Sequence, residues 1–215
     1  IPLPDVIVSY LRAIQVNLRH QAPARTVRWV APEGIHLTLK FLGDVPLTHA
    51  GDIEGALVEA ARAHDGFALS IGGLGCFPNP NRPRVLWAGI EGERHALAAL
   101  RDDVERQVAP LGYPTEDRPF SPHLTLGRIR PEASRTDAAT VGSLLGHVTV
   151  GAVHTWRVGH VSLMRSELSP RGAIYSELAR APLPGAHRLA RPQPGLGAGR
   201  HRRLPRRGRR RLRRR

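Results

Sequence analysis

The chain has 215 residues, 41% of them hydrophobic, and a formal net charge of +14. This length and this hydrophobic content suffice for a globular protein with a sizeable core. Thirteen of the 32 basic residues are arginines between Gly185 and Arg215, where no residue is acidic, which leaves 19 basic residues against all 18 acidic ones before that stretch. The excess charge therefore belongs to a tail, and a uniformly basic body is excluded.

A single cysteine, Cys76, excludes an intrachain disulfide and a cysteine-based zinc cluster, which fits a reducing compartment. The amino end has no basic-then-apolar export signal, and no stretch approaches the roughly 18 to 20 apolar residues that a membrane helix needs. We therefore expect a soluble, cytoplasmic protein.

The first half of the chain predicts two helices and three strands. Apolar residues three and four apart predict a helix from Asp5 to Arg19 and another around Ile53 to Ala61. Alternation between turn residues predicts a strand from His36 to Leu42. Two shorter strands are predicted at 67–71 and 85–90, on either side of a loop rich in Gly and Pro.

The second half repeats this order. A helix is predicted from Leu97 to Val108, a strand from His123 to Ile129 and a short helix around Thr136 to Leu145. Three further strands are predicted at 148–153, 158–164 and 173–178. Strands and helices in this order favour an α+β fold with largely antiparallel sheets.

Beyond Pro184 the composition changes to Arg, Pro and Gly with few apolar residues, so burial cannot offset the entropy of ordering. We therefore divide the chain into a body, residues 1–184, and a disordered Arg-rich tail, residues 185–215. Polyarginine would bind RNA nonspecifically through counterion release.

The tetrapeptide His-Leu-Thr-Leu occurs twice, at 36–39 and at 123–126, each time after a loop that contains proline. Because side chains alternate along a strand, each histidine shares a face with its threonine and the two leucines share the other. Two such strands across a groove would bring two imidazoles and two hydroxyls to one reacting centre. Phosphoester cleavage needs a base, an acid and donors for the charge on phosphorus, and two groups of pKa near 6.5 can divide the first two roles.

The segments Gly34-Ile35-His36-Leu37-Thr38-Leu39-Lys40-Phe41-Leu42-Gly43 and Phe120-Ser121-Pro122-His123-Leu124-Thr125-Leu126-Gly127-Arg128 resemble both signature motifs of the two-histidine phosphoesterases. The branch that they resemble most is the RNA 2′,3′-cyclic phosphodiesterases, also called 2′-5′ RNA ligases. The resemblance runs from about Ile1 to Pro184 and includes Arg84-Val85-Leu86-Trp87-Ala88-Gly89 and Leu163-Met164-Arg165-Ser166-Glu167-Leu168.

This resemblance implies a bilobal α+β fold with pseudo-twofold symmetry, in which two mainly antiparallel sheets with outer helices surround a central groove. It implies that His36 is the proton donor to the leaving O3′, that His123 is the proton acceptor for water, and that Thr38 and Thr125 bind the phosphate. It also implies a monomeric enzyme without a metal or other cofactor, whose partner is RNA with a 2′,3′-cyclic phosphate end, as in tRNA processing. The product would be a 2′-phosphomonoester, and the resemblance also implies reversible 2′-5′ RNA ligation.

Three other residues are candidates for binding substrate. Lys40, the only lysine, shares the His36 face and is either a phosphate contact or a solvated strand end. Phe41, like Trp29 and Trp87, could stack a nucleobase or belong to the core. Arg128 falls on the face opposite to His123 unless a bulge or twist re-aims it.

The sequence departs from the family at its amino end. Members begin with a strand before the first helix, and this chain has only Ile1-Pro2-Leu3-Pro4 there. We therefore expect the sheet to lack one strand and to expose an edge.

Two other functions remain open from the sequence. One is a phosphoesterase of the same fold that acts on a small cyclic nucleotide or cyclic phosphate. The other is a non-enzymatic RNA-binding module that uses the groove or the tail.

Overall fold

The structure is a computed structural model that describes residues 1–148, 150, 154–169 and 172–185. Its helices are α1 (Asp5–Gln21), α2 (Ala50–Arg62), α3 (Arg94–Val108) and α4 (Arg135–Leu145), with short 3-10 helices η1 (Pro32–Gly34), η2 (Leu47–His49) and η3 (Ala109–Leu111). Its strands are β1 (Val27–Trp29), β2 (Phe67–Phe77), β3 (Val85–Gly92), β4 (His123–Ile129), β5 (Thr155–Val158), β6 (His160–Ser169) and β7 (Gly172–Pro182).

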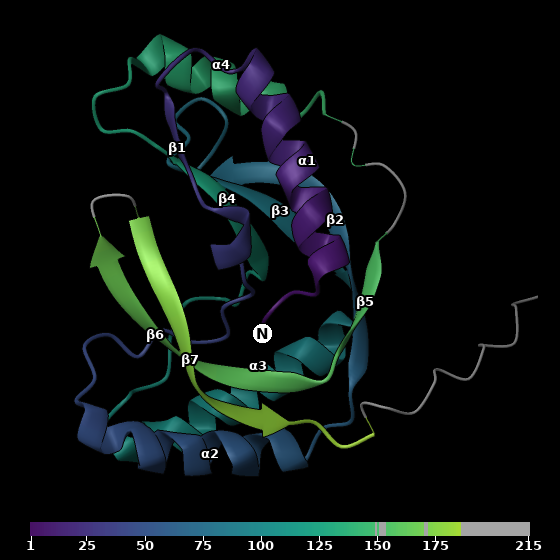
Figure 1. Ribbon diagram of the computed structural model, residues 1–215, viewed down its shortest axis with the longest axis vertical. Helices are drawn as coiled ribbons and strands as arrows, with labels where there is room; N and C mark the ends of the chain where they lie inside the picture. The colour runs from purple at the N-terminus through teal and green to yellow at the C-terminus, as the bar shows by residue number, and fades with distance from the viewer. Residues whose placement is uncertain (149, 151–153, 170–171, 186–215) are drawn as a thin grey trace, which may run out of the picture.

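The strands form one five-stranded sheet, in the order β1-β4-β3-β2-β5, and one hairpin, β6-β7. Every pairing in both is antiparallel. Figure 1 shows α1 and α4 with the larger sheet in the upper part of the molecule, and α2 and α3 beneath the β6-β7 hairpin. The expected α+β fold with antiparallel sheets and outer helices is confirmed.

Helix α1 forms because its apolar residues repeat at helical spacing, and the structure buries that stripe, including Ile7, Leu11 and Leu18. Gln15 lies within the stripe and is also buried. Its Nε2 donates to the carbonyl oxygens of Val30 and Leu126, at 2.8 Å each. Because a buried amide must find partners, these two bonds fix α1 against the second tetrapeptide.

The predicted helices are all present within a few residues of their expected bounds. Strand β4 has the predicted bounds, β2 continues to Phe77, and the strands expected at 85–90, 158–164 and 173–178 correspond to β3, β6 and β7. The strand expected at 148–153 falls mostly outside the described residues, and its two described residues, 148 and 150, are not in a strand. The tail from residue 186 also lies outside them. No helix in the described ranges is long and apolar enough to cross a membrane.

The predicted strand from His36 to Leu42 is wrong. Only Leu37 is bridged, to Leu124 of β4, and the chain bends at Leu39. A strand needs a hydrogen-bonded neighbour along its length, and on the other side of this segment only Ile1 pairs with it. The Ile1 amine donates to the Leu37 carbonyl at 2.8 Å, and the Leu37 amide donates to the Ile1 carbonyl at 3.0 Å.

Ile1 thus pairs with the first tetrapeptide on the side away from β4. Its side chain is buried, and its main chain forms the two hydrogen bonds to Leu37.

Candidate functional site

The second tetrapeptide lies in β4, where its faces alternate as expected. Leu124 and Leu126 are fully buried, whereas His123 and Thr125 are only partly buried. Across the sheet, Gly89 of β3 pairs with His123 and Trp87 pairs with Thr125. The histidine and threonine thus share one face of the five-stranded sheet with the Trp87 indole.

The first tetrapeptide has the same alternation without being a strand. Leu37 is fully buried and Leu39 is 9% exposed, whereas His36 and Thr38 are partly buried. Burial of the two leucines is sufficient to aim the polar pair away from the core. The single bridge between Leu37 and Leu124 holds this segment against β4.

The antiparallel direction of that bridge brings the two motifs together. Because the two segments run antiparallel, the residue before Leu37 lies opposite the residue after Leu124. His36 therefore faces Thr125, and Thr38 faces His123. Directly opposite residues in such a pair have Cβ atoms about 5 Å apart, and diagonal ones such as His36 and His123 about 7 to 8 Å apart. A local twofold axis therefore passes between the two leucines and relates one imidazole–hydroxyl pair to the other.

Both imidazoles are held in the same way. Nδ1 of His36 donates to the Gly34 carbonyl at 2.9 Å, and Nδ1 of His123 donates to the Ser121 carbonyl at 2.7 Å. In each case the acceptor is two residues before the histidine, and a carbonyl can only accept, so Nδ1 carries the hydrogen. Each Nε2 is left available to take up or release a proton.

An aromatic ring lies edge-on to each imidazole. The Tyr175 ring, from β7, is 4.6 Å from the His36 ring, and the Phe77 ring, at the end of β2, is 5.0 Å from the His123 ring. Both pairs are T-shaped. The rings limit rotation of the imidazoles, because a T-shaped pair packs well only over a narrow range of orientations.

Trp87 supports the His123 side of the site. Its ring lies 5.3 Å from Phe77 and covers Gly75, where an added Cβ would come within 2.3 Å of the indole. Gly75 is therefore required for the indole to lie against the sheet. Trp29 is on the other side, where Arg19 of α1 stacks on it at 5.5 Å, so it is not near the histidines' face.

The environment of His36 favours its neutral form. Burial lowers the pKa of His36, and the hydrogen bond to Gly34 has a smaller effect in the opposite direction. His36 is thus a poor proton acceptor in the free protein, and bound anionic phosphate would raise its pKa again.

The structure gives Lys40 a role that the sequence did not anticipate. Its ammonium donates to Oε2 of Glu105 at 2.5 Å and to the Pro114 carbonyl at 2.7 Å, and both charged side chains are buried, 7% and 4% exposed. Lys40 is therefore neither a solvated strand end nor directed at the phosphate. It joins the end of the first motif to α3 and to the loop that leads to the second.

Phe41 and Arg128 are both exposed. Phe41 is 76% exposed and lines a hollow of about 420 Å³ with Tyr113 and Arg118. Arg128 lies just after a β-bulge, because Trp87 pairs with Thr125 while Leu86 pairs with Gly127, which leaves Leu126 as the extra residue. The bulge shifts the alternation by one, so Arg128 emerges on the face of His123 and Thr125.

Sequence reasoning missed the residues that position the histidines: Tyr175, Phe77, Gln15 and Glu105. None has a local pattern that points to the site, because each reaches it from a distant element. The one available signal was Gly34 and Ser121 at matching positions, two residues before each histidine.

Comparison with known proteins is consistent with this geometry. A family model described as LigT like phosphoesterase matches residues 1–87 and 90–175. A protein of Methanothermobacter thermautotrophicus named RNA 2′,3′-cyclic phosphodiesterase is 38% identical over 83% of this chain and 93% of its own. One of Thermus thermophilus with the same name is 33% identical over 86% of this chain and 88% of its own.

Solved structures agree in fold. A crystal structure of a Thermus thermophilus protein has a TM-score of 0.68 and 31% identity, covering 86% of this chain and 96% of its own. The structure of E. coli LigT complexed with 3′-AMP has a TM-score of 0.66 and 27% identity, covering 86% of this chain and 95% of its own.

Proposed function

Because this chain belongs to the LigT-like phosphoesterase family, we propose that it hydrolyses the 2′,3′-cyclic phosphate at the end of an RNA to a 2′-phosphomonoester. One observation carries the proposal. Two imidazoles, each with Nδ1 bound to a backbone carbonyl and Nε2 free, lie diagonally across the Leu37–Leu124 bridge, and each faces a threonine hydroxyl.

In the forward reaction, Nε2 of His123 accepts a proton from water while the water oxygen bonds to phosphorus. The bond from phosphorus to O3′ breaks, and Nε2 of His36 donates a proton to O3′. Thr38 and Thr125 donate hydrogen bonds to the phosphoryl oxygens, which gain negative charge in the transition state. A second proton transfer between the histidines and solvent restores the starting state.

The assignment of donor and acceptor follows the family resemblance, and it requires the neutral His36 of the free protein to become protonated when substrate binds. An imidazolium in a partly buried site is a stronger acid than in water, and the anionic phosphate supplies the charge that favours its protonation. With a 5′-hydroxyl in place of water, the same pair in the same roles would join that hydroxyl to the cyclic phosphate through a 2′-5′ bond, and the roles would exchange when this bond is cleaved back to the cyclic phosphate. We include this ligation, and a place in cytoplasmic tRNA processing, in the proposal.

We also propose that the reaction needs no metal. Every proton transfer above is assigned to a histidine, and the charge on phosphorus to the threonines.

Phe41 and Arg128 are proposed to bind the RNA beyond the reacting phosphate. Arg128 shares the face of Thr125, where a guanidinium can pair with a phosphate oxygen. The exposed ring of Phe41 can stack on a base. Lys40 is left out, because its ammonium is bound to Glu105.

The test is turnover of an oligoribonucleotide with a 2′,3′-cyclic phosphate end, in excess EDTA, by His36→Ala and His123→Ala. Loss of acid or base help should slow each variant by about 10² to 10⁴-fold. His95→Ala, at an exposed position of α3, is the matched control and should retain the wild-type rate. Wild-type rates in either site variant, or loss of wild-type activity in EDTA, would contradict the mechanism, and a 3′-phosphate product would contradict O3′ as the leaving oxygen.

A small cyclic nucleotide remains the second candidate substrate. The observation in its favour is that E. coli LigT, a solved relative, was crystallised with the mononucleotide 3′-AMP. Comparing kcat/KM for a nucleoside 2′,3′-cyclic phosphate and for the oligonucleotide separates the two, since equal or better turnover of the nucleotide contradicts RNA as the substrate.

A further inference from the structure

Three arginines lie together at one end of the five-stranded sheet. Arg28 of β1 pairs directly with Arg128 of β4, and Val85 of β3 pairs with Arg128 from the other side. Arg84 precedes Val85, and its carbonyl accepts from the Ile129 amide at 2.9 Å. Three neighbouring chain segments thus each contribute an arginine, and all three side chains are exposed.

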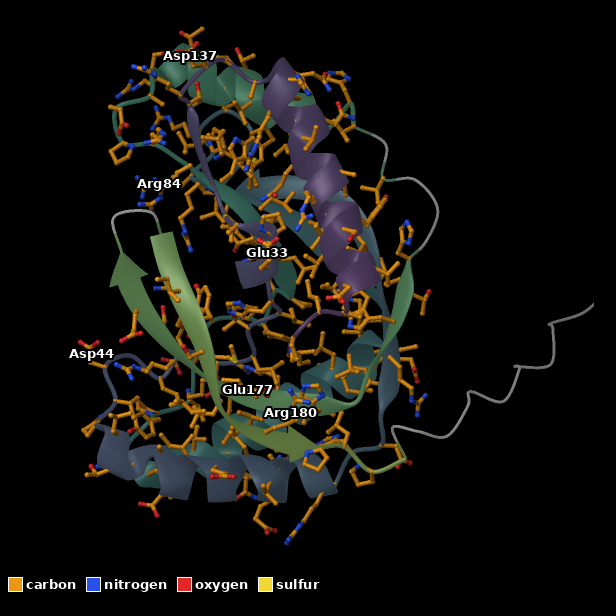
Figure 2. The ribbon with its side chains drawn as sticks, viewed as in Figure 1. Glu33, Asp44, Arg84, Asp137, Glu177 and Arg180 are labelled. Carbon is orange, nitrogen blue, oxygen red and sulfur yellow. The ribbon has the colours of Figure 1, made fainter. Side chains whose placement is uncertain are left out.

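Arg28 and Arg128 lie on the face of the catalytic residues, and Arg84 is exposed at the end of the neighbouring strand. The bulge in β4 turns Arg128 toward the side of His123 and Thr125, and Arg28 points the same way because directly opposite residues share a face. The buried Val27, next to Arg28, faces the core instead. Figure 2 shows Arg84 at the margin of the upper lobe, on the side of the β6-β7 hairpin.

Among the described residues, no acidic group forms an ion pair with this cluster. Within the described ranges, Arg28, Arg84 and Arg128 take part in no ion pair and no side-chain hydrogen bond. Like charges directly opposite each other on neighbouring strands destabilise a sheet. Because the chain before the tail is almost neutral, three adjacent unpaired arginines are a local concentration of charge rather than part of a general excess.

The distance from the histidines is too long for a single nucleotide to span and suits an oligonucleotide. Arg128 is five residues beyond His123 along β4, which corresponds to roughly 15 Å at about 3.3 Å per residue. A single nucleotide whose cyclic phosphate lies between the histidines would leave most of this cluster unoccupied. An RNA strand continuing from that nucleotide would carry further phosphates across it.

We propose that Arg28 and Arg84, with Arg128 between them, bind internucleotide phosphates of the RNA strand upstream of its cyclic end, and that they make the protein prefer an oligonucleotide to a mononucleotide. This inference rests on the proposed phosphodiesterase function and assigns the substrate class of the same site. The chemistry is that of charge-assisted hydrogen bonds from guanidinium to phosphate, which carry no base specificity.

The experiment compares wild type, with its tail, with Arg28→Gln, Arg84→Gln and the double variant. For each, kcat/KM is measured on a nucleoside 2′,3′-cyclic phosphate and on an oligoribonucleotide ending in one, at several salt concentrations. The ratio of oligonucleotide to nucleotide kcat/KM should fall by about three- to ten-fold for each arginine. For the oligonucleotide, the slope of log kcat/KM against log salt should flatten by about 0.7 for each phosphate that a variant no longer binds.

Arg62→Gln, on α2 in the other lobe, is the matched control, because it removes the same charge from a distant surface. The tail is present in every variant, so its RNA binding cancels in the comparison. Thermal unfolding of each variant detects a folding defect. Arg28→Gln should leave the unfolding midpoint unchanged or raise it, because it removes the repulsion between Arg28 and Arg128.

An unchanged ratio and salt slope in the double variant would overturn the inference, as would equal losses on both substrates. If wild type turned over neither substrate, the proposed function itself would fail. That outcome differs from an unchanged ratio and from equal losses, because in those two cases the wild type is active.

Discussion

The two His-Leu-Thr-Leu segments have the same sequence and the same alternation of buried leucines with partly buried polar residues, but the molecule supports them differently. The second is the start of a seven-residue strand between two neighbours, whereas the first is held by the single Leu37–Leu124 bridge and by Ile1. Both nevertheless direct Nδ1 to a carbonyl two residues earlier and place an aromatic ring edge-on to the imidazole. The orientation of the histidines thus depends on these local contacts rather than on membership of a strand.

The position four residues after each histidine shows how the supports diverge. In the first segment it is Lys40, whose buried ion pair with Glu105 anchors the segment to α3. In the second it is Gly127, where a Cβ would lie 2.7 Å from the Val27 side chain and 3.2 Å from the Arg28 carbonyl. One copy needs a long charged side chain to reach its support, and the other needs no side chain because β1 packs directly on it.

The largest expected effect tests whether the two halves act as one unit. His36→Ala combined with His123→Ala should lose about as much activity as the more damaging single variant, because an acid and a base that serve the same step are not additive. Single-turnover rates on the cyclic-phosphate oligonucleotide measure this. A double variant whose loss is the product of the two single losses would mean that the imidazoles act in separate steps.

A second prediction compares the two buried leucines of the bridge. Leu37→Ala and Leu124→Ala should each lower the free energy of unfolding by about 2 to 5 kcal/mol, since both side chains are fully buried. The loss should be larger at Leu124, because a strand fixed on both sides cannot collapse into the cavity as readily as the singly bridged segment. Urea unfolding measures the difference, and a larger loss at Leu37 would show that the first segment is the more rigid one.

A third prediction concerns the anchor that only the first segment has. Lys40→Met should lower the free energy of unfolding by about 1 to 3 kcal/mol. This is less than the loss expected when a buried charge keeps no partner, because Glu105 still contacts Arg101 at 3.1 Å and the Glu116 amide at 3.2 Å. The loss should persist at high salt, since a buried pair is poorly screened. Unfolding at two salt concentrations provides the measurement, with Arg62→Gln as the exposed control. Unchanged stability together with a raised KM would instead restore Lys40 as a phosphate contact.

The sequence was sufficient to predict the helices, β4 and the alternation within both tetrapeptides, because these depend on residues close together in the chain. It could not predict that the first tetrapeptide lacks a ladder, since that depends on which segments pair with it across the fold. Alternation of polar and apolar residues indicates only that one face of a segment is buried. Leu37 and Leu39 are buried in this way although they do not belong to a strand. The three residues of β1 were too few to show a period.

The supports of the site were beyond prediction for the same reason. Tyr175 and Phe77 come from β7 and β2, and nothing near either residue in the sequence indicates an imidazole beside it. The bulge that re-aims Arg128 appears only when the β3–β4 register is known, because Leu126 becomes an extra residue only relative to its partner strand.

The smallest expected effect concerns the different burial of the two imidazoles. Burial lowers the pKa of His36, and the Tyr175 ring is part of what covers it, so Tyr175→Leu should raise that pKa toward its ordinary 6.5. Phe77→Leu, the matched change beside His123, should leave His36 unaffected. NMR titration of the histidine ring protons, assigned with His36→Ala, measures both.

Since the folded protein favours neutral His36, its contribution to stability is present above pH 6.5 and is lost as the pH falls through the lower pKa of the folded state. A His36 signal that titrates at or above pH 6.5 in the wild type would contradict this account. An equal change of the His36 pKa in Tyr175→Leu and Phe77→Leu would show that each aromatic ring does not act specifically on the imidazole beside it.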